Sequence, residues 1–211
     1  MLFLKPKTLA TFESKYNGKI KVIQQLGGIK IVASDLLQSG SIIKDLWQKP
    51  LHKFKNKNLK IKDVLLFGLG GGTLIPMLGK TYPDCNITAI EIDPIMIKIA
   101  HDFFKIEENN NLKIINDDAF SFIKNYQEKF DLILIDIYKG NQIPEGLNKK
   151  SFYQNLKKIT NPQSFLICNC LFFDQYRKKT EEIVQYFAKY FTNIQLLRHL
   201  SNLFIIINLN K

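Results

Sequence analysis

The chain has 211 residues, of which 45% are hydrophobic, and this predicts one sizeable core with at most a small appendage. No stretch approaches the roughly 18 to 20 consecutive apolar residues of a membrane span, and residues 1–6 are too short for the apolar region of a signal peptide. We therefore expect a cytoplasmic protein with no membrane partner.

The positive charge of the chain raises nucleic-acid binding as a hypothesis. The formal net charge is +11, but only Arg177 and Arg198 among the 30 basic residues are arginine. Arginine is better suited than lysine to forming paired hydrogen bonds with phosphates and bases, so its scarcity argues against dedicated nucleic-acid recognition. Three consecutive basic residues at 177–179 lie at the start of a predicted helix, where the helix dipole disfavours positive charge. They could form a face for an acidic partner or a solvated surface, and the sequence does not distinguish the two.

The cysteines and histidines predict no metal site. Neither set shows C-x-x-C or metal-ligand spacing, and the members are Cys85, Cys168, Cys170, His52, His101 and His199. Two of the cysteines fall within an apolar run at 165–170, which predicts buried thiols. Ser121 and Ser151 lack the glycine-flanked turn of a hydrolase nucleophile.

The first third of the chain predicts a small antiparallel ribbon. Runs of β-forming residues at 8–12, 19–25 and 29–33 are separated by Asn-Gly and Gly-Gly, which are turn dipeptides. A helix over 41–53 follows, with Ser41 as its expected N-cap. The polar tract 53–58 then predicts a connector, so we divide the chain into an N-terminal β-hairpin region with its linking helix (1–58) and a second domain (59–211).

From residue 64 the pattern becomes an alternation of strands and helices, which is typical of a parallel sheet covered by helices. The expected segments are 64–67, 73–80, 87–91, 94–104, 112–116, 119–126, 132–136, 165–170, 174–191, 193–197 and 203–207. The link between the last two strands is too short for a parallel crossover, so they form an antiparallel pair. The prediction is an α/β, Rossmann-like class I methyltransferase fold: a seven-stranded, mostly parallel sheet with one antiparallel strand.

A glycine-rich turn predicts the ligand site. Residues 64–67 form an apolar strand that runs into Gly68, Gly70 and Gly72 and then a helix. Glycine lets a ligand lie against the backbone, and the helix N-terminus offers unpaired N–H groups. A tight turn of any α/β domain would have the same pattern, so the motif alone does not identify a ligand site.

Acidic residues at the ends of the following strands strengthen the prediction. Glu91 ends the next strand, about 20 residues on, where a carboxylate can accept hydrogen bonds from both ribose hydroxyls. Asp93 is better explained as a solvated helix cap. Asp117, Asp118 and Asp136 end the later strands, with capping as the alternative for the first two. These carboxyl ends converge on the crevice where open α/β sheets bind ligands, and NAD stays a competitor to S-adenosylmethionine on these motifs.

In order and spacing the chain resembles the spermidine synthase family, and more closely its bacterial spermidine-synthase-like branch. The resemblance covers residues 12–170 and rests on 13–16, 34–39, 68–72, 91–94, 117–119, 131–136 and 140–144 with Phe152. It implies that Gln38 and the glycine loop hold the tail of the nucleoside of S-adenosylmethionine, or of its decarboxylated form. It also implies that Glu91 holds the ribose, that Asp118 meets the adenine amine and that Asp136 helps to deprotonate an attacking amine.

The chain departs from the family where a diamine would bind. Family members carry an acidic residue in the glycine loop, a Tyr-His-Glu run in the first helix and a second Asp after the fourth strand; this chain has Gly71, residues 42–44 ending in Lys44, and Lys139. A dication needs carboxylates to offset the cost of losing its water. Putrescine is therefore not the expected acceptor.

Three functions follow as hypotheses. The first is methyl transfer from S-adenosylmethionine to an unidentified neutral or acidic small molecule, with Asp136 as candidate base and Tyr138 on the acceptor wall. The second is aminopropyl transfer, with replacement acids from among Glu13, Asp45 and Glu145. The third is a non-catalytic nucleoside-binding or interaction module. The resemblance also suggests a homodimer.

Overall fold

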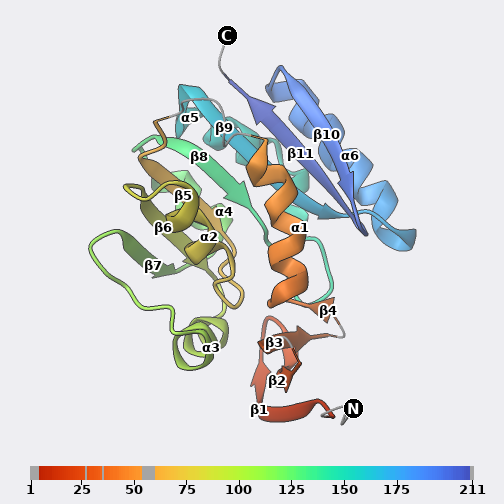
Figure 1. Ribbon diagram of the computed structural model, residues 1–211. Helices are drawn as coiled ribbons and strands as arrows, with labels where there is room; N and C mark the ends of the chain where they lie inside the picture. Colours follow the sequence, from red (N-terminus) through yellow and green to blue (C-terminus); the bar gives the residue numbers. More distant parts are fainter. Residues whose placement is uncertain (1–4, 27, 35, 54–59, 210–211) are drawn as a thin grey trace.

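The computed structural model describes residues 5–26, 28–34, 36–53 and 60–209, and it places a central β-sheet between two layers of helices (Figure 1). In this part of the chain the sheet has seven strands in the order β10-β11-β9-β8-β5-β6-β7. The strands are β5 (Asp63–Phe67), β6 (Asn86–Glu91), β7 (Leu112–Asn116), β8 (Phe130–Ile135), β9 (Thr160–Leu171), β10 (Ile194–His199) and β11 (Asn202–Asn208).

The strand directions confirm the predicted class. Strand β5 pairs in parallel with β6 and β8, β6 with β7, and β8 with β9, whereas β11 runs antiparallel to both β9 and β10. The chain leaves β5 towards β6 and β7 and then returns to the other side of β5 for β8 and β9. The carboxyl ends of β5 and β8 therefore flank the switch point at which open α/β sheets bind ligands.

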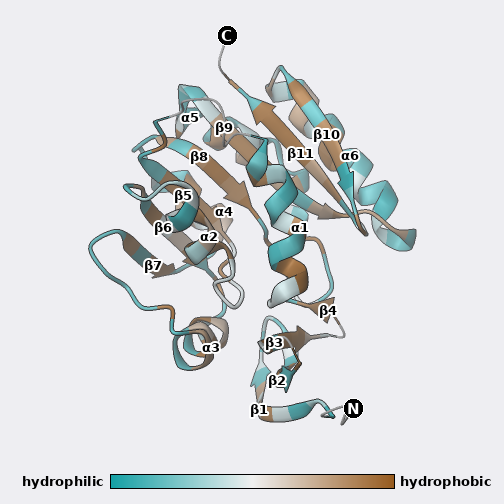
Figure 2. Cartoon of the chain, viewed as in Figure 1, coloured by the Kyte–Doolittle hydropathy of each residue, from teal (hydrophilic) through white to brown (hydrophobic). Residues whose placement is uncertain are grey.

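Helices cover both faces of the sheet because the strands are apolar on both sides. Leu46, Leu78 and Ala100 of the first three helices pack on one face, and Ile123, Tyr153 and others from the last three pack on the opposite face. Figure 2 shows hydrophobic central strands and a largely hydrophilic exterior on the helices. The helices are α1 (Ser41–His52), α2 (Leu74–Thr81), α3 (Pro94–Phe104), α4 (Ala119–Asn125), α5 (Lys150–Lys158) and α6 (Arg177–Tyr190), with short 3₁₀ turns η1 (Glu145–Asn148) and η2 (Asp174–Tyr176).

The predicted N-terminal ribbon is present as an antiparallel sheet that packs on α3 (Figure 1). Its strands are β1 (Lys7–Ser14), β2 (Gly18–Gln25), β3 (Gly28–Ala33) and β4 (Leu36–Leu37). Ile20 and Ile31 from the ribbon are fully buried with Met96 and Ile99 of α3. This packing places the turn after β4 over the carboxyl edge of the large sheet.

Several elements differ from the sequence-based expectations. The helix expected over 174–191 is the 3₁₀ turn η2 followed by α6. Ser41 is the first residue of α1 and not its N-cap; the N-cap is Gly40, without a side-chain cap. Helix α5 was not predicted, because its few apolar residues stand among lysines and polar residues. Strand β9 begins at Thr160 and not at 165. The expected domain boundary at 58/59 lies outside the described residues.

Candidate functional site

A pocket opens at the carboxyl ends of the parallel strands, and it is lined in the order of the sheet. Asn202 (β11), Asn169 (β9) and Asp136 (after β8) line one end, and Glu91 (β6) and Asp117 (after β7) line the other. The glycine turn after β5 lies between them. We call these the acceptor end and the nucleoside end.

Six of the seven residues predicted for the site meet in this pocket. They are Gln38, Gly68, Gly70, Glu91, Asp118 and Asp136. Gly72 is not among the lining residues: its φ is +74°, and a Cβ added there would lie 2.5 Å from Cγ1 of Ile106. Gly72 therefore provides close packing between the turn and the segment after α3, whereas Gly68 and Gly70 line the pocket.

Gly68 is required by a close approach of two backbone segments. Its φ is +91°, and an added Cβ would lie 2.1 Å from the carbonyl oxygen of Asp136. Hydrogen bonds hold both segments in place: Gly68 N donates to Ile90 O (2.9 Å) and Asp136 N donates to Phe67 O (2.8 Å). A side chain at position 68 would therefore separate the turn from the acceptor end.

The buried carboxylate of Glu91 holds the glycine turn. Its Oε2 accepts hydrogen bonds from Leu69 N (3.0 Å) and Gly70 N (3.2 Å), and its Oε1 accepts from Asp93 N (2.9 Å). Burial raises the pKa of Glu91, and the three N–H donors oppose that shift. A carboxylate has about four lone-pair sites, and the three N–H donors leave one free, on Oε1. Since the residue lines the pocket, Glu91 can accept a hydrogen bond from a ribose hydroxyl while it holds the turn.

Two other acidic residues cap helices at the nucleoside end. Asp93, expected to be solvated, is buried: it accepts from Ile95 N at the start of α3 and from Ser14 Oγ (2.5 Å) and Asn17 Nδ2 (2.6 Å). It therefore links the N-terminal sheet to the start of α3. Asp118 caps α4 through Phe120 N, at 2.9 Å, and also lines the pocket, so capping and ligand contact are compatible there.

Asp136 is held by a chain of neutral donors that the sequence did not reveal. Its Oδ2 accepts from Trp47 Nε1 (3.0 Å) and its Oδ1 from Asn169 Nδ2 (2.9 Å), while Asn202 Nδ2 donates to Asn169 Oδ1 (2.8 Å). Tyr138 lines the same end and donates to the backbone oxygen of Asn169 (3.1 Å). Burial raises the pKa of Asp136 and outweighs the two donors. The acceptor end thus combines one carboxyl group with amides and a phenol.

The acidic residues needed for a diamine are missing from the pocket wall. Lys139 lines the pocket, whereas Lys44 is exposed on α1 and does not, so only one of the two lysines faces an acceptor. Glu13, Asp45 and Glu145, the residues considered as replacements, are exposed and are not among the lining residues. Asp136 is therefore the carboxyl group left at the acceptor end.

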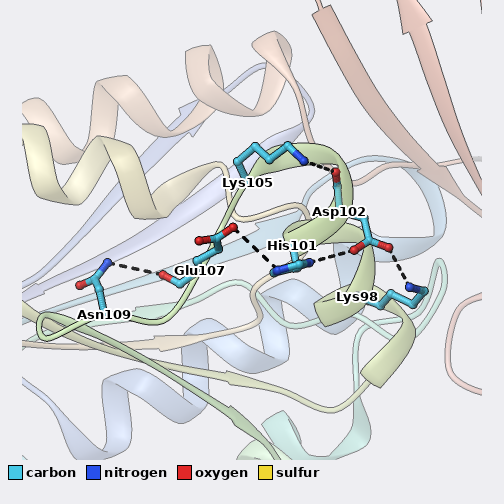
Figure 3. A network of polar contacts seen from close by, with 6 residues as sticks. All are labelled: Lys98, His101, Asp102, Lys105, Glu107 and Asn109. Atoms are coloured by element: carbon cyan, nitrogen blue, oxygen red, sulfur yellow. Dashed lines mark hydrogen bonds and ion pairs between the residues drawn. The ribbon is translucent and has the colours of Figure 1, made fainter.

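A second polar network lies on the surface and away from the pocket (Figure 3). It joins His101 to Asp102 (2.8 Å) and Asp102 to Lys98 (2.8 Å) around the end of α3, and its members are absent from the pocket wall. Within the described residues no group of three or more His, Cys, Asp or Glu could hold a metal ion. In the same residues, no helix has the length and apolar character needed to cross a membrane.

The two cysteines of the apolar run 165–170 are buried, as predicted. All three cysteines of the chain are free thiols. Cys168 and Cys170 lie on β9 with their sulfurs 3.7 Å apart. The hydrogen bond to Cys170, and then burial, raise the pKa of Cys168. The raised pKa keeps the thiolate form of Cys168 scarce. All three cysteines are buried and serve as core packing.

We expect Asp136→Asn to flatten the pH dependence of stability. The folded chain holds the Asp136 proton to a higher pH than the unfolded chain, so the free energy of unfolding decreases as the pH rises above the ordinary value of 3.8. Asparagine removes this contribution. Urea denaturation between pH 4 and 7 measures the slope, and the exposed Asp84→Asn is the control. Equal slopes for wild type and Asp136→Asn would contradict the shift.

Comparison with known families identifies the architecture. Residues 43–203, more than half of the chain, match the family model of the spermine/spermidine synthase domain. The chain belongs to this family. The spermidine synthase in complex with the transition state analogue AdoDATO covers 97% of this chain and 74% of its own length with a TM-score of 0.79, at 15% identity. The fold is therefore that of the spermidine synthases.

The names of two relatives found by sequence comparison describe two different activities. The chain is 32% identical over 115 residues to the polyamine aminopropyltransferase of Vibrio vulnificus, covering 53% of this chain and 38% of that protein. It is also 32% identical over 131 residues to the eEF1A lysine and N-terminal methyltransferase homolog of Drosophila pseudoobscura pseudoobscura, covering 58% of this chain and 19% of that protein. The chain spans less than half of the length of either relative.

Proposed function

We propose that this protein binds S-adenosylmethionine and transfers its methyl group to a small acceptor that is not a diamine. The nucleoside lies between Gln38, the glycine turn, Glu91 and Asp118, and its sulfonium points towards Asp136. The sulfonium is already activated, so the site has to supply positioning more than chemical assistance. Asp136, oriented by Trp47 Nε1, accepts the proton of the attacking group.

The residues at the acceptor end are the main support for this proposal. It presents the carboxyl group of Asp136 with a raised pKa, amides and the cation of Lys139, and this set would leave a desolvated dication without its counter-charges. Methyl transfer needs no diamine pocket beside the donor, and one relative of similar identity is named a methyltransferase.

Aminopropyl transfer from decarboxylated S-adenosylmethionine is the second candidate, favoured by the aminopropyltransferase name of the Vibrio vulnificus relative. It requires the same nucleoside contacts, because the two donors differ in the carboxylate of the methionine part. The choice between the candidates therefore depends on whether the pocket accommodates that carboxylate and on which acceptor it binds.

Calorimetric titration with S-adenosylmethionine, decarboxylated S-adenosylmethionine and NAD tests the proposal. We expect S-adenosylmethionine to bind at least about tenfold more tightly than the other two, and labelled methyl groups to appear on a neutral or acidic acceptor but not on putrescine. Preference for the decarboxylated donor would replace methyl by aminopropyl transfer. Binding without turnover on any acceptor pool would indicate a non-catalytic module, and no binding would remove the cofactor assignment.

Restoring the family's acidic residue in the glycine loop should fail for steric reasons. A Cβ at Gly71 would lie 2.6 Å from Cβ of the fully buried Ser39 and 2.9 Å from Cδ1 of Ile31. We expect Gly71→Asp to lower the free energy of unfolding by about 1–3 kcal/mol without creating putrescine binding. In the Gly71→Asp/Ser39→Gly double variant part of this loss should return, which urea denaturation would show. Strictly additive losses would contradict a direct clash.

A further inference from the structure

The two arginines of the chain meet on one aromatic ring. Cζ of Arg177 lies 5.4 Å and Cζ of Arg198 5.5 Å from the centroid of the Phe172 ring. Arg177 opens α6 and Arg198 lies near the end of β10, so two separate elements bring them together. The other 28 basic residues, of the 30, are lysines, and arginine is the cation suited to stacking on a ring while its fork stays free for hydrogen bonds.

Neither guanidinium is neutralised within the described residues. The ion pairs found there involve Lys98 and His101, and both arginines are exposed without an acidic partner. The first turn of α6 contains no acidic residue, and the positive end of the helix dipole adds to the charge of Arg177. The acidic residues nearest in sequence to Arg177 are Asp174 and Glu181, and neither forms an ion pair with an arginine.

The ring that carries the arginines adjoins the acceptor end of the pocket. Phe172 follows Leu171, and its N–H donates to the carbonyl oxygen of Ser201 (2.8 Å), the residue before Asn202. Both Leu171 and Asn202 line the pocket. Figure 1 shows the start of α6 beside the tip of the β10–β11 hairpin, next to this edge of the sheet.

A further bond connects the arginine region to the loop that carries Lys139. Tyr176, directly before Arg177, donates its hydroxyl to the carbonyl oxygen of Asn141 (2.7 Å). The loop from Tyr138 to Pro144 lines the pocket at Tyr138, Lys139 and Pro144. Lys139 lines the acceptor end itself, whereas Arg177, Arg198 and Phe172 lie just outside the lining residues and are joined to them through Leu171, Asn202 and this loop.

We propose that Arg177 and Arg198 bind an anionic group, a carboxylate or a phosphate, of the acceptor substrate, which deepens the proposed transferase function and rests on it. A guanidinium offers paired N–H donors that match the two oxygens of such a group. The anion binds at the mouth on the Phe172 platform, and the nucleophilic end of the acceptor reaches inward to Asp136. The acceptor is therefore an anionic small molecule.

Binding of small anions to the protein saturated with S-adenosylhomocysteine tests this assignment. The probes are benzoate and phenyl phosphate, which separate carboxylate from phosphate, with benzyl alcohol and putrescine as neutral and cationic comparisons, all at about 0.15 M salt to screen long-range attraction. We expect at least one anion to bind about tenfold or more tightly than either comparison. Arg177→Gln and Arg198→Gln should each weaken that anion at least about tenfold.

Lys113→Gln is the matched control, because it removes the same charge from an exposed residue on β7, at the far edge of the sheet. Equal weakening in Lys113→Gln, or unchanged anion binding in both arginine variants, would overturn the proposal. Arginine-dependent binding of a poly-glutamate peptide without binding of either small anion would also overturn it, in favour of an acidic protein partner. Failure of S-adenosylhomocysteine itself to bind would instead reject the proposed function.

Discussion

Gly68→Ala is expected to lower the free energy of unfolding by about 3 kcal/mol or more. The added Cβ would lie 2.1 Å from the oxygen and 2.9 Å from the carbon of the Asp136 carbonyl, both of them backbone atoms. Neither segment can move easily, because each ends a strand of the central sheet and donates a hydrogen bond to its neighbour. The residue must also keep a φ of +91°, which is strained for any L side chain. Urea denaturation of the purified variant measures the loss.

Gly79→Ala is the matched control for this substitution. Gly79 lies inside α2, and nothing is found within 4 Å of an added Cβ. Alanine there should raise the free energy of unfolding by about 0.5–1 kcal/mol, since it restricts the unfolded chain and favours the helix. If Gly68→Ala does not fold, Gly70→Ala gives a graded test: its φ of +54° is less severe, and its added Cβ would lie 3.1 Å from Gln38 O. A stability of Gly68→Ala equal to wild type would show that the turn is not tightly packed.

Elements with strong local patterns were predictable from the sequence almost to the residue. The bounds of α3 and β7 agree with the expectation, because Asp93 and Pro94 mark a helix start and an apolar run marks the strand. Helix α5 was missed since its amphipathic face is carried by Phe152, Tyr153 and Leu156 in a short polar segment. Its helical state depends on tertiary burial of those residues, which no local pattern records.

The nucleoside end was predictable from strand-end motifs, whereas at the acceptor end the sequence indicated Asp136 and Tyr138 but not the side chains that hold Asp136. Glycines and acids that follow apolar strands necessarily meet at one edge of a parallel sheet. Trp47, Asn169 and Asn202 come from a helix and from two strands distant in the chain, and only folding places them around Asp136. The one available signal was an asparagine between Cys168 and Cys170 in an otherwise apolar run. A buried amide in a strand needs a polar partner, and that partner is the catalytic candidate.

Glu91→Gln is expected to weaken S-adenosylmethionine binding by about 10- to 100-fold. The charged carboxylate can accept a hydrogen bond from a ribose hydroxyl while it also accepts hydrogen bonds from three backbone N–H groups. Glutamine has one acceptor oxygen, so either Asp93 N–H or the pair at Leu69 and Gly70 would face its NH₂ group. The turn then loses its anchor and the ligand loses a charge-assisted bond. Calorimetry at a temperature well below unfolding measures the affinity.

The interpretation depends on separating the ligand role of Glu91 from its structural role. Thermal unfolding reports the loss of the turn, for which about 1–3 kcal/mol is expected, and Glu13→Gln on the exposed β1 strand should change neither quantity. Glu91→Asp keeps the charge but shortens the reach. If it restores stability without affinity, then the carboxylate has to contact the ligand itself. Unchanged affinity in Glu91→Gln, together with lowered stability, would mean that Glu91 only supports the glycine turn, and the nucleoside would then depend on Gln38, Asp118 and the turn backbone.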